Sequence, residues 1–151
     1  MDALALIQQI ESQRERWLVL AEASDGQPEL AVLLRRPPEV DWPELLGASV
    51  RRRAEVAKAA VITGAVNWRG FTEATLLGAS VGANQPLPFD ARVWAVVVVD
   101  RMDWIDKAYR RLLEQVTEQA AARGAAAKNS KPSSTPKPAA GSRTAKRARG
   151  Q

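Results

Sequence analysis

The pattern of apolar positions predicts two elements in the N-terminal part of the chain. Leu4, Ile7 and Ile10 recur every three residues among good helix formers, which predicts a short helix over residues 2–14. The two apolar runs on either side of "SDGQP" have strand length, and Asp-Gly is a strong turn signal, so a β-hairpin is predicted over residues 17–36. The alanines and leucines of these runs would suit a helix equally well, and the pattern leaves that alternative open.

The middle of the chain predicts one long helix after a break. Pro37 and Pro38 end the hairpin, because proline lacks an N–H and steers the preceding residue away from helical angles. A helix over residues 42–62 is then predicted, with Asp41 as its N-cap and Gly64 ending it in a left-handed conformation. Its apolar stripe consists of Leu45, Leu46, Val50, Ala54, Ala57 and Val61.

The stretch "NWRGFTEATLLG", residues 67–78, predicts a corner followed by a short helix. Thr72 has the side chain of a good N-cap, and Gly78 closes the predicted helix. The next residues, 79–86, are small or proline and predict a loop without a regular element.

The last apolar segment predicts helix from Asp90, its N-cap, through Val116 and beyond. A break is predicted within residues 100–103. Val96–Val99 would suit a strand by propensity, because branching at Cβ restricts the side-chain rotamers of valine in a helix. Helix and strand therefore both stay open for these four residues, and the apolar stripe favours helix. The stripe consists of Trp94, Val98, Met102 (or Arg101), Ile105, Tyr109, Leu112 and Val116.

Together these elements predict a mainly α fold of the α+β class. We expect a small helical domain over residues 1–122, with the candidate β-hairpin, and a disordered basic tail over residues 123–151. That tail carries eight lysines and arginines, no acidic residue and no apolar side chain larger than alanine, so it cannot offset the entropy of ordering. The net charge of +5 therefore comes from the tail, because residues 1–122 hold more acidic than basic side chains.

The residue types in the chain limit the kinds of catalytic and metal site that it can form. The chain has no histidine and no cysteine, which removes the usual general base, thiolate zinc sites and disulfides. Asp100, Asp103 and Asp106 share one helix face, but interleaved basic side chains favour an ion-paired surface over a metal site. We therefore expect a protein that is not an enzyme and has no cofactor and no metal.

The hydropathy pattern indicates no contact with a membrane. The longest apolar run, Val93–Val99, has seven residues, whereas a membrane-spanning helix needs about 20. The N-terminus is acidic at Asp2 and lacks the basic start of a secretory signal. We expect a cytoplasmic protein.

The basic tail is a candidate site for polyanions. Its charge favours weak, salt-dependent contact with nucleic acid, and the lack of aromatic side chains makes that contact independent of sequence. A solubilising extension or a flexible tether is the equally weighted alternative. The candidate residues are Lys128, Lys131, Lys137, Arg143, Lys146, Arg147 and Arg149.

The five tryptophans are predicted to be mainly core anchors. Trp42 and Trp68 lie beside chain breaks, so these two are the candidates for partly exposed interface anchors, although Trp68 is expected foremost to anchor the fold. Replacing Trp68 should then destabilise the domain.

The order of motifs resembles the small tail assembly chaperones encoded among the tail genes of tailed bacteriophages and prophages. The resemblance covers residues 35–118 and rests on "RRPPEVDWPELL", on the corner "NWRGFTEATLLG" and on "LPFD" followed by a helical segment. The residues that carry it, and that are candidate interaction or structural residues, are Trp42, Trp68, Gly70, Phe71, Thr72, Pro88, Phe89 and Trp104.

This resemblance implies a function in morphogenesis and not in catalysis. Such proteins are thought to bind the long, largely helical tape measure protein and to help recruit tail-tube subunits, in the bacterial cytoplasm and in some cases as part of the virion. A small helical body can hold an amphipathic segment by helix-in-groove packing. A small phage accessory protein that binds nucleic acid through its basic tail is the alternative function.

Overall fold

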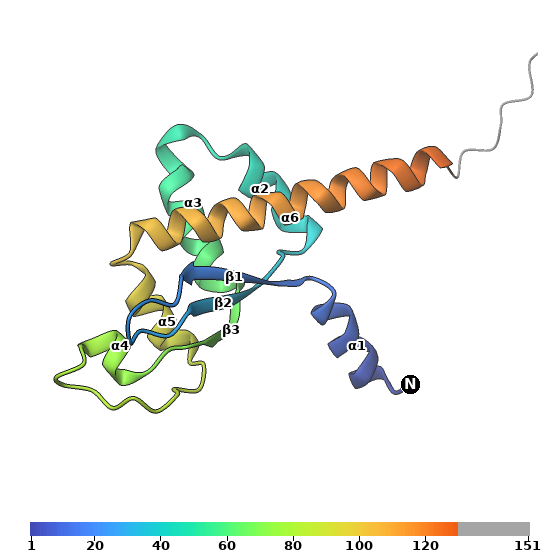
Figure 1. Cartoon of the computed structure of the whole chain (residues 1–151). Helices are drawn as coiled ribbons and strands as arrows, with labels where there is room; N and C mark the ends of the chain where they lie inside the picture. The colour runs from blue at the N-terminus through green and yellow to red at the C-terminus, as the bar shows by residue number, and fades with distance from the viewer. Residues whose placement is uncertain (130–151) are drawn as a thin grey trace, which may run out of the picture.

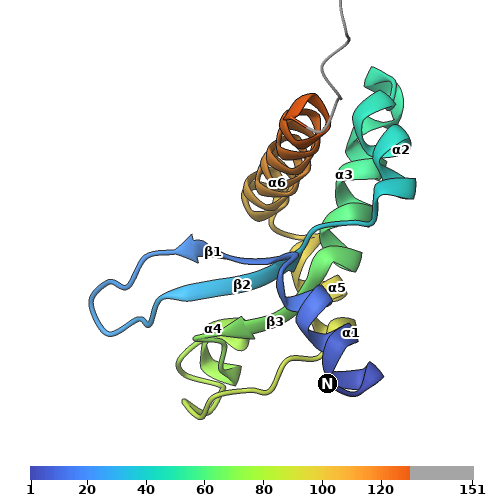
Figure 2. The same cartoon turned by 90° about the vertical axis from the view of Figure 1, so that its right-hand side faces the viewer.

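The computed structural model describes residues 1–129 and confirms a mainly helical fold with a small antiparallel sheet (Figure 1). Helices α3 and α6 lie on the same side of the sheet in both views (Figures 1 and 2). The predicted tail from residue 130 onward lies outside the described residues. The elements are α1 (Ala3–Ser12), β1 (Glu15–Ala21), β2 (Leu30–Arg35), the 3-10 turn η1 (Glu39–Asp41), α2 (Trp42–Gly47), α3 (Val50–Gly64), β3 (Ala65–Arg69), α4 (Glu73–Leu77), α5 (Ala91–Val98) and α6 (Met102–Asn129).

The N-terminal hairpin is confirmed, because β1 and β2 pair antiparallel and β3 adds to the other edge of β2. Leu18, Val32 and Trp68 are paired across the three strands and so share the face that packs on the helices. Trp17 and Leu33 point to the opposite face, where the guanidinium of Arg69 lies 4.6 Å from the centroid of the Trp17 ring. The sheet therefore has one face in the core and one face toward solvent.

The predicted helix over residues 42–62 is wrong, because the structure contains two helices there. Ala48 is extended between them and Ser49 is the N-cap of α3, a position that serine favours. Gly47 is a poor helix former, which explains where the first helix ends. The stripe is accordingly interrupted: Leu46 and Val50 are exposed, whereas Leu45, Ala57 and Val61 are buried.

Strand β3 replaces the corner that the sequence predicted after Gly64. The chain passes from α3 directly into the extended residue Ala65, so the left-handed end predicted at Gly64 is wrong. The turn comes five residues later at Gly70, whose φ is +84°. A Cβ atom on Gly70 would lie 1.9 Å from the carbonyl oxygen of Glu29, so only glycine fits where this turn passes the hairpin.

The caps predicted in the second half of the chain are confirmed. Thr72 and Thr75 form a reciprocal capping box at the start of α4, and Gly78 ends that helix with a φ of +104°. The Asp90 carboxylate accepts hydrogen bonds from the backbone N–H groups of Arg92 and Val93 at the start of α5. The cap at Asp41 is not formed by its side chain, because the 3-10 turn η1 already precedes α2.

The valine run is helical through Val98, and the chain breaks before α6 as predicted. Met102, which the stripe placed in the core, is 63% exposed because it lies at the first residue of α6. Helix α6 continues to Asn129, so residues 123–129, which were predicted as the start of the disordered tail, are helical. Six of the eight residues over 120–127 are alanine, the residue with the highest helix propensity, and they favour the extension in spite of Gly124.

Candidate functional site

The residues of the corner signature lie together in an aromatic cluster inside the fold. The rings of Trp68 and Phe71 stack with centroids 4.7 Å apart, and Phe89 meets Trp68 edge-on at 5.2 Å. Trp104 meets Phe71 edge-on at 5.9 Å and stacks on Trp94 at 6.4 Å. These pairs join β3, α5 and α6 into one core.

Hydrogen bonds fix the same cluster to the loop before α5. The indole N–H of Trp68 donates to the carbonyl oxygen of Leu87 at 2.8 Å, which anchors the segment leading to the half-buried Phe89. Pro88, beside them, is exposed. Thr72 is buried and its hydroxyl caps α4. The signature residues from Trp68 to Trp104 are therefore parts of the core and its turns.

Trp42 belongs to a second, smaller core. It packs with Leu45 and Val116, and its indole N–H donates to the carbonyl oxygen of Pro37 at 2.9 Å. Both Trp42 and Trp68 are more than nine-tenths buried, so the prediction that they lie partly exposed as interface anchors is wrong. A tryptophan beside a chain break can bury its ring under the break, and the sequence pattern does not distinguish the two cases.

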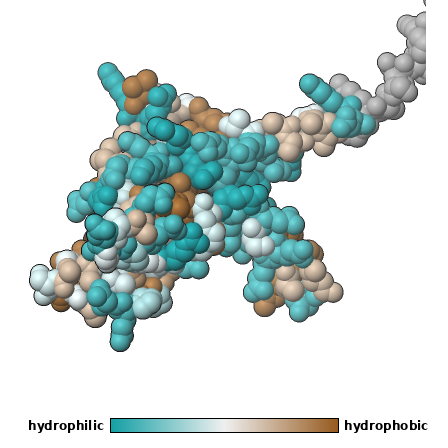
Figure 3. Space-filling view, viewed as in Figure 1, coloured by the Kyte–Doolittle hydropathy of each residue, from teal (hydrophilic) through white to brown (hydrophobic). Residues whose placement is uncertain are grey.

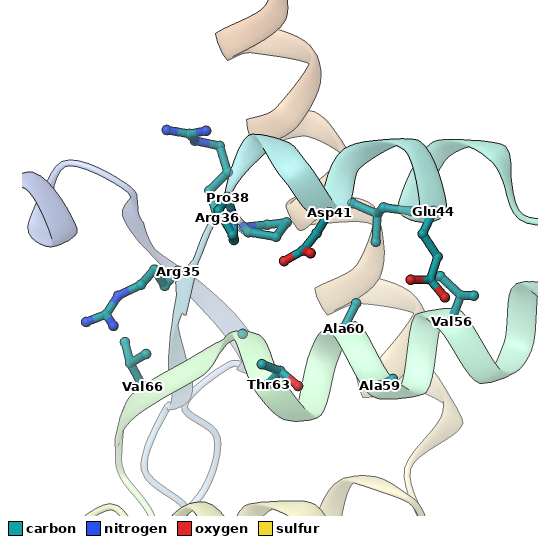
Figure 4. A pocket seen from close by; sticks show the side chains of 13 residues that line it. Arg35, Arg36, Pro38, Asp41, Glu44, Val56, Ala59, Ala60, Thr63 and Val66 are labelled. Atoms are coloured by element: carbon teal, nitrogen blue, oxygen red, sulfur yellow. The ribbon is translucent and has the colours of Figure 1, made fainter.

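The concave surface that sequence reasoning missed is a groove between α3 and the segment that leads from β2 into α2 (Figure 4). Its volume is about 410 Å³. Figure 4 shows Ala59, Ala60 and Thr63 on the α3 wall, with Pro38 and Asp41 opposite. The apolar part consists of Leu45, Val56, Ala59, Ala60, Val66 and the prolines 37 and 38.

The groove exists because the chain breaks twice around it. The two prolines lead the chain away from β2, and the extended residues Ala48 and Ser49 turn it back into α3. Small side chains on α3, Ala59 and Ala60, leave the space that larger residues would fill. A continuous helix over 42–62, as predicted from the sequence, would contain no such groove.

Charges lie at both ends of the groove. Arg35 and Arg36 line it beside Gly64, and Asp41 and Glu44 line it toward Val56. Arg35 already donates to the Glu15 carboxylate at 2.7 Å and lies 3.6 Å from that of Glu11. The Arg35 and Arg36 side chains point away from the floor of the groove, whereas the Asp41 side chain points toward it (Figure 4). The groove therefore has an apolar floor faced by an acidic side chain, with arginines at its rim, and an amphipathic helix would fit it.

Arginines gather next to the basic end. Arg14, Arg16 and Arg36 line a smaller cavity of about 200 Å³, together with the buried Gln115. Burial lowers the pKa of the Arg36 guanidinium, and the positive charges of Arg14 and Arg123 lower it further. The face of the Trp42 ring lies 5.5 Å from the same guanidinium. An anionic group at this end would relieve the mutual repulsion of the arginines.

Of the seven basic residues predicted to bind polyanions, only Lys128 lies within the described residues. Lys128 lies exposed near the end of α6, and Lys131, Lys137, Arg143, Lys146, Arg147 and Arg149 lie outside the described residues.

Asp103 pairs with Arg101 at 2.9 Å, which holds the pKa of that carboxyl below its usual value. Within residues 1–129, no group of three acidic side chains could hold a metal ion, and no helix is both long and apolar enough to cross a bilayer.

Comparisons with protein-family models, with curated proteins and with solved structures each return no match for this chain.

Proposed function

We propose that this protein is a non-enzymatic assembly chaperone of phage tail morphogenesis, acting in the cytoplasm of the bacterial host. In this proposal the groove holds an amphipathic helical segment of a client, the tape measure protein or a tail-tube subunit. The groove itself is the observation that carries the proposal, because its apolar floor and charged ends suit a helix and not a small polar substrate. The resemblance of residues 35–118 to tail assembly chaperones supplies the class of client.

The signature residues have a structural role in this proposal. The Trp68 cluster fixes β3, and β3 follows α3 directly, so the cluster sets the position of the α3 wall. Trp42 holds the opposite wall through its hydrogen bond to Pro37. Loss of either anchor should weaken client binding by deforming the groove. No signature residue has to touch the client.

The test is co-expression with the proposed client, a phage tape measure protein, followed by purification of the complex. Ala59→Asp places a carboxylate in the apolar floor and should reduce client recovery by at least about tenfold, since an unpaired charge is costly to bury. Ala54→Asp is the matched control, because Ala54 is exposed on the same helix and does not line the groove. Equal recovery with both variants, or no recovery with the unmodified chain, would contradict the proposal.

A second candidate function is non-specific binding of nucleic acid through the basic C-terminal residues. It is favoured by the arginines that gather at Arg14, Arg16 and Arg36, because they add basic surface within the described part of the chain. DNA binding of the full chain should then be strong at about 50 mM salt and fall steeply as salt rises. A chain ending at Asn129 keeps α6 whole and should lose most of this affinity; retention of full affinity would rule out the tail.

A further inference from the structure

Helix α1 is an amphipathic helix whose apolar side is uncovered. Its ten residues include none that is buried. Leu4, Leu6, Ile7 and Ile10 lie within one half of the helix circumference, at about 100° per residue, and are 44–65% exposed. An isolated helix of this length is marginal in water, so packing against another surface must contribute to its stability.

Figures 1 and 3 show how α1 stands apart. In Figure 1 it projects from the body, and in Figure 3 the same lobe carries brown and tan hydrophobic surface on its outside. The connection to β1 consists of Gln13 and Arg14 alone. The Arg14 N–H donates to the carbonyl oxygen of Glu11 at 2.9 Å and the Arg36 N–H to that of Arg14 at 2.8 Å, so the C-terminal end of α1 is fixed beside β2 while the helix itself projects outward (Figure 1).

The groove has the dimensions of α1. It follows α3 from Val56 to Gly64, about 12 Å at 1.5 Å per residue, and α1 is about 15 Å long. The small side chains of Ala59 and Ala60 let a second helix approach closely. Within residues 1–129, nothing covers the apolar face of α1 and no segment occupies the groove.

The charges also match in one direction. The C-terminal half of α1 carries Glu11 and no basic side chain, and the negative end of the helix dipole lies there. Arg35 lies at the end of the groove that suits it, and within one chain its guanidinium is 3.6 Å from the Glu11 carboxylate, a pair that the exchange would replace by the same pair between two copies. The other end, with Asp41 and Glu44, suits the positive N-terminal end of a helix. A basic helix in the same position would meet the arginines with like charge.

We infer that the groove of one copy holds α1 of a second copy, and that the exchange is reciprocal. A two-fold dimer results, in which each chain donates α1 and receives the other, so the same pair of surfaces is used twice. The proposed client does not enter into this assembly. One consequence alone rests on the proposed function: a client helix must displace α1, so dimer and client complex exclude each other.

The association is measured on the full chain, without a client, by sedimentation equilibrium. The unmodified chain should be dimeric at micromolar concentration. Ile7→Asp in α1 and Ala59→Asp in the groove should each weaken association by at least about tenfold, because each places a charge in an apolar contact. Gln9→Asp and Ala54→Asp are the matched controls, on the polar side of α1 and on α3 outside the groove, and should leave it unchanged.

Mixing the two weakened variants gives the sharper result. Ile7→Asp keeps an intact groove and Ala59→Asp keeps an intact α1, so the mixture should form a heterodimer that neither variant forms alone. A monomeric unmodified chain overturns the inference, as does a dimer that Ala59→Asp leaves intact, since another surface would then hold it. The client test stays separate, because Ile7→Asp should still capture the client through its unaltered groove.

Discussion

Replacing Trp68 by alanine tests whether the aromatic cluster holds the fold together. Trp68 is 6% exposed, stacks on Phe71 and meets Phe89 edge-on. Its indole N–H donates to the carbonyl oxygen of Leu87. The substitution removes the whole ring and leaves a cavity between β3, α6 and the loop before α5. It also leaves the half-buried Leu87 carbonyl group without its donor.

The expected decrease in the free energy of unfolding follows from the loss of the ring contacts and of the hydrogen bond. Cutting a buried tryptophan to alanine costs about 3–5 kcal/mol, which includes the cavity, and the lost hydrogen bond places the value near the upper half, at about 4 kcal/mol. Domains of this size are stable by about 5–15 kcal/mol, so the variant should be folded but weak. Urea unfolding followed by circular dichroism should show a midpoint lower by about 2 M, for an m-value of about 2 kcal/mol/M.

Trp17→Ala is the matched control. Trp17 is 38% exposed on the solvent face of the sheet and contacts Arg69 there, so its loss should cost about 1 kcal/mol or less. Trp68→Phe separates packing from hydrogen bonding, since it keeps most of the ring and removes the donor. Equal midpoints for Trp68→Ala and Trp17→Ala would refute the assignment of Trp68 to the core.

Two further substitutions test the turn and the cap. Gly70→Ala should destabilise the protein by about 3 kcal/mol, since the new Cβ collides with the Glu29 carbonyl oxygen in addition to the strain of a positive φ. Gly26 has a φ of +71° and open space around it, so Gly26→Ala should cost about 1 kcal/mol in the same urea assay. Equal losses of stability for the two variants would contradict the collision at Gly70. Hydrogen bonds from Arg92 hold the pKa of Asp90 at about 2, below the ordinary 3.8, so its contribution to stability is complete above about pH 4 and is lost as the pH falls through 2. The difference in urea midpoint between the unmodified chain and Asp90→Ala should therefore be constant at neutral pH, shrink below about pH 4 and be largely lost below pH 2. An undiminished difference below pH 2 would show that the charge of Asp90 is not what stabilises α5.

Local signals in the sequence were enough where one short segment determines the structure. Thr72 and Asp90 cap their helices because their side chains reach backbone N–H groups two or three residues away. The hairpin turn likewise follows from the Asp-Gly pair, with Gly26 at a positive φ. The valine run became helical because Trp94 and Val98 on the same helix face are both completely buried.

The features that depend on distant segments were missed. Strand β3 has only five residues, and it exists because the edge of β2 offers backbone partners to Ala65–Arg69. The groove needs the break at Ala48 and Ser49, which no proline marks, so the apolar stripe ran through it. The burial of Trp42 depends on Val116 from α6, more than seventy residues away in the sequence. Periodicity within one segment carries no information about such partners.

The C-terminal end of α6 extends beyond the body of the protein (Figure 1). Beyond Arg123, which pairs with Glu39 on the body, the helix continues for six exposed residues, about 9 Å. Figure 1 shows this end standing clear of the other elements. The body of α6 packs along α3, which forms one wall of the groove. The distance between the groove and the C-terminal end of α6 is therefore determined by the number of helical turns in α6.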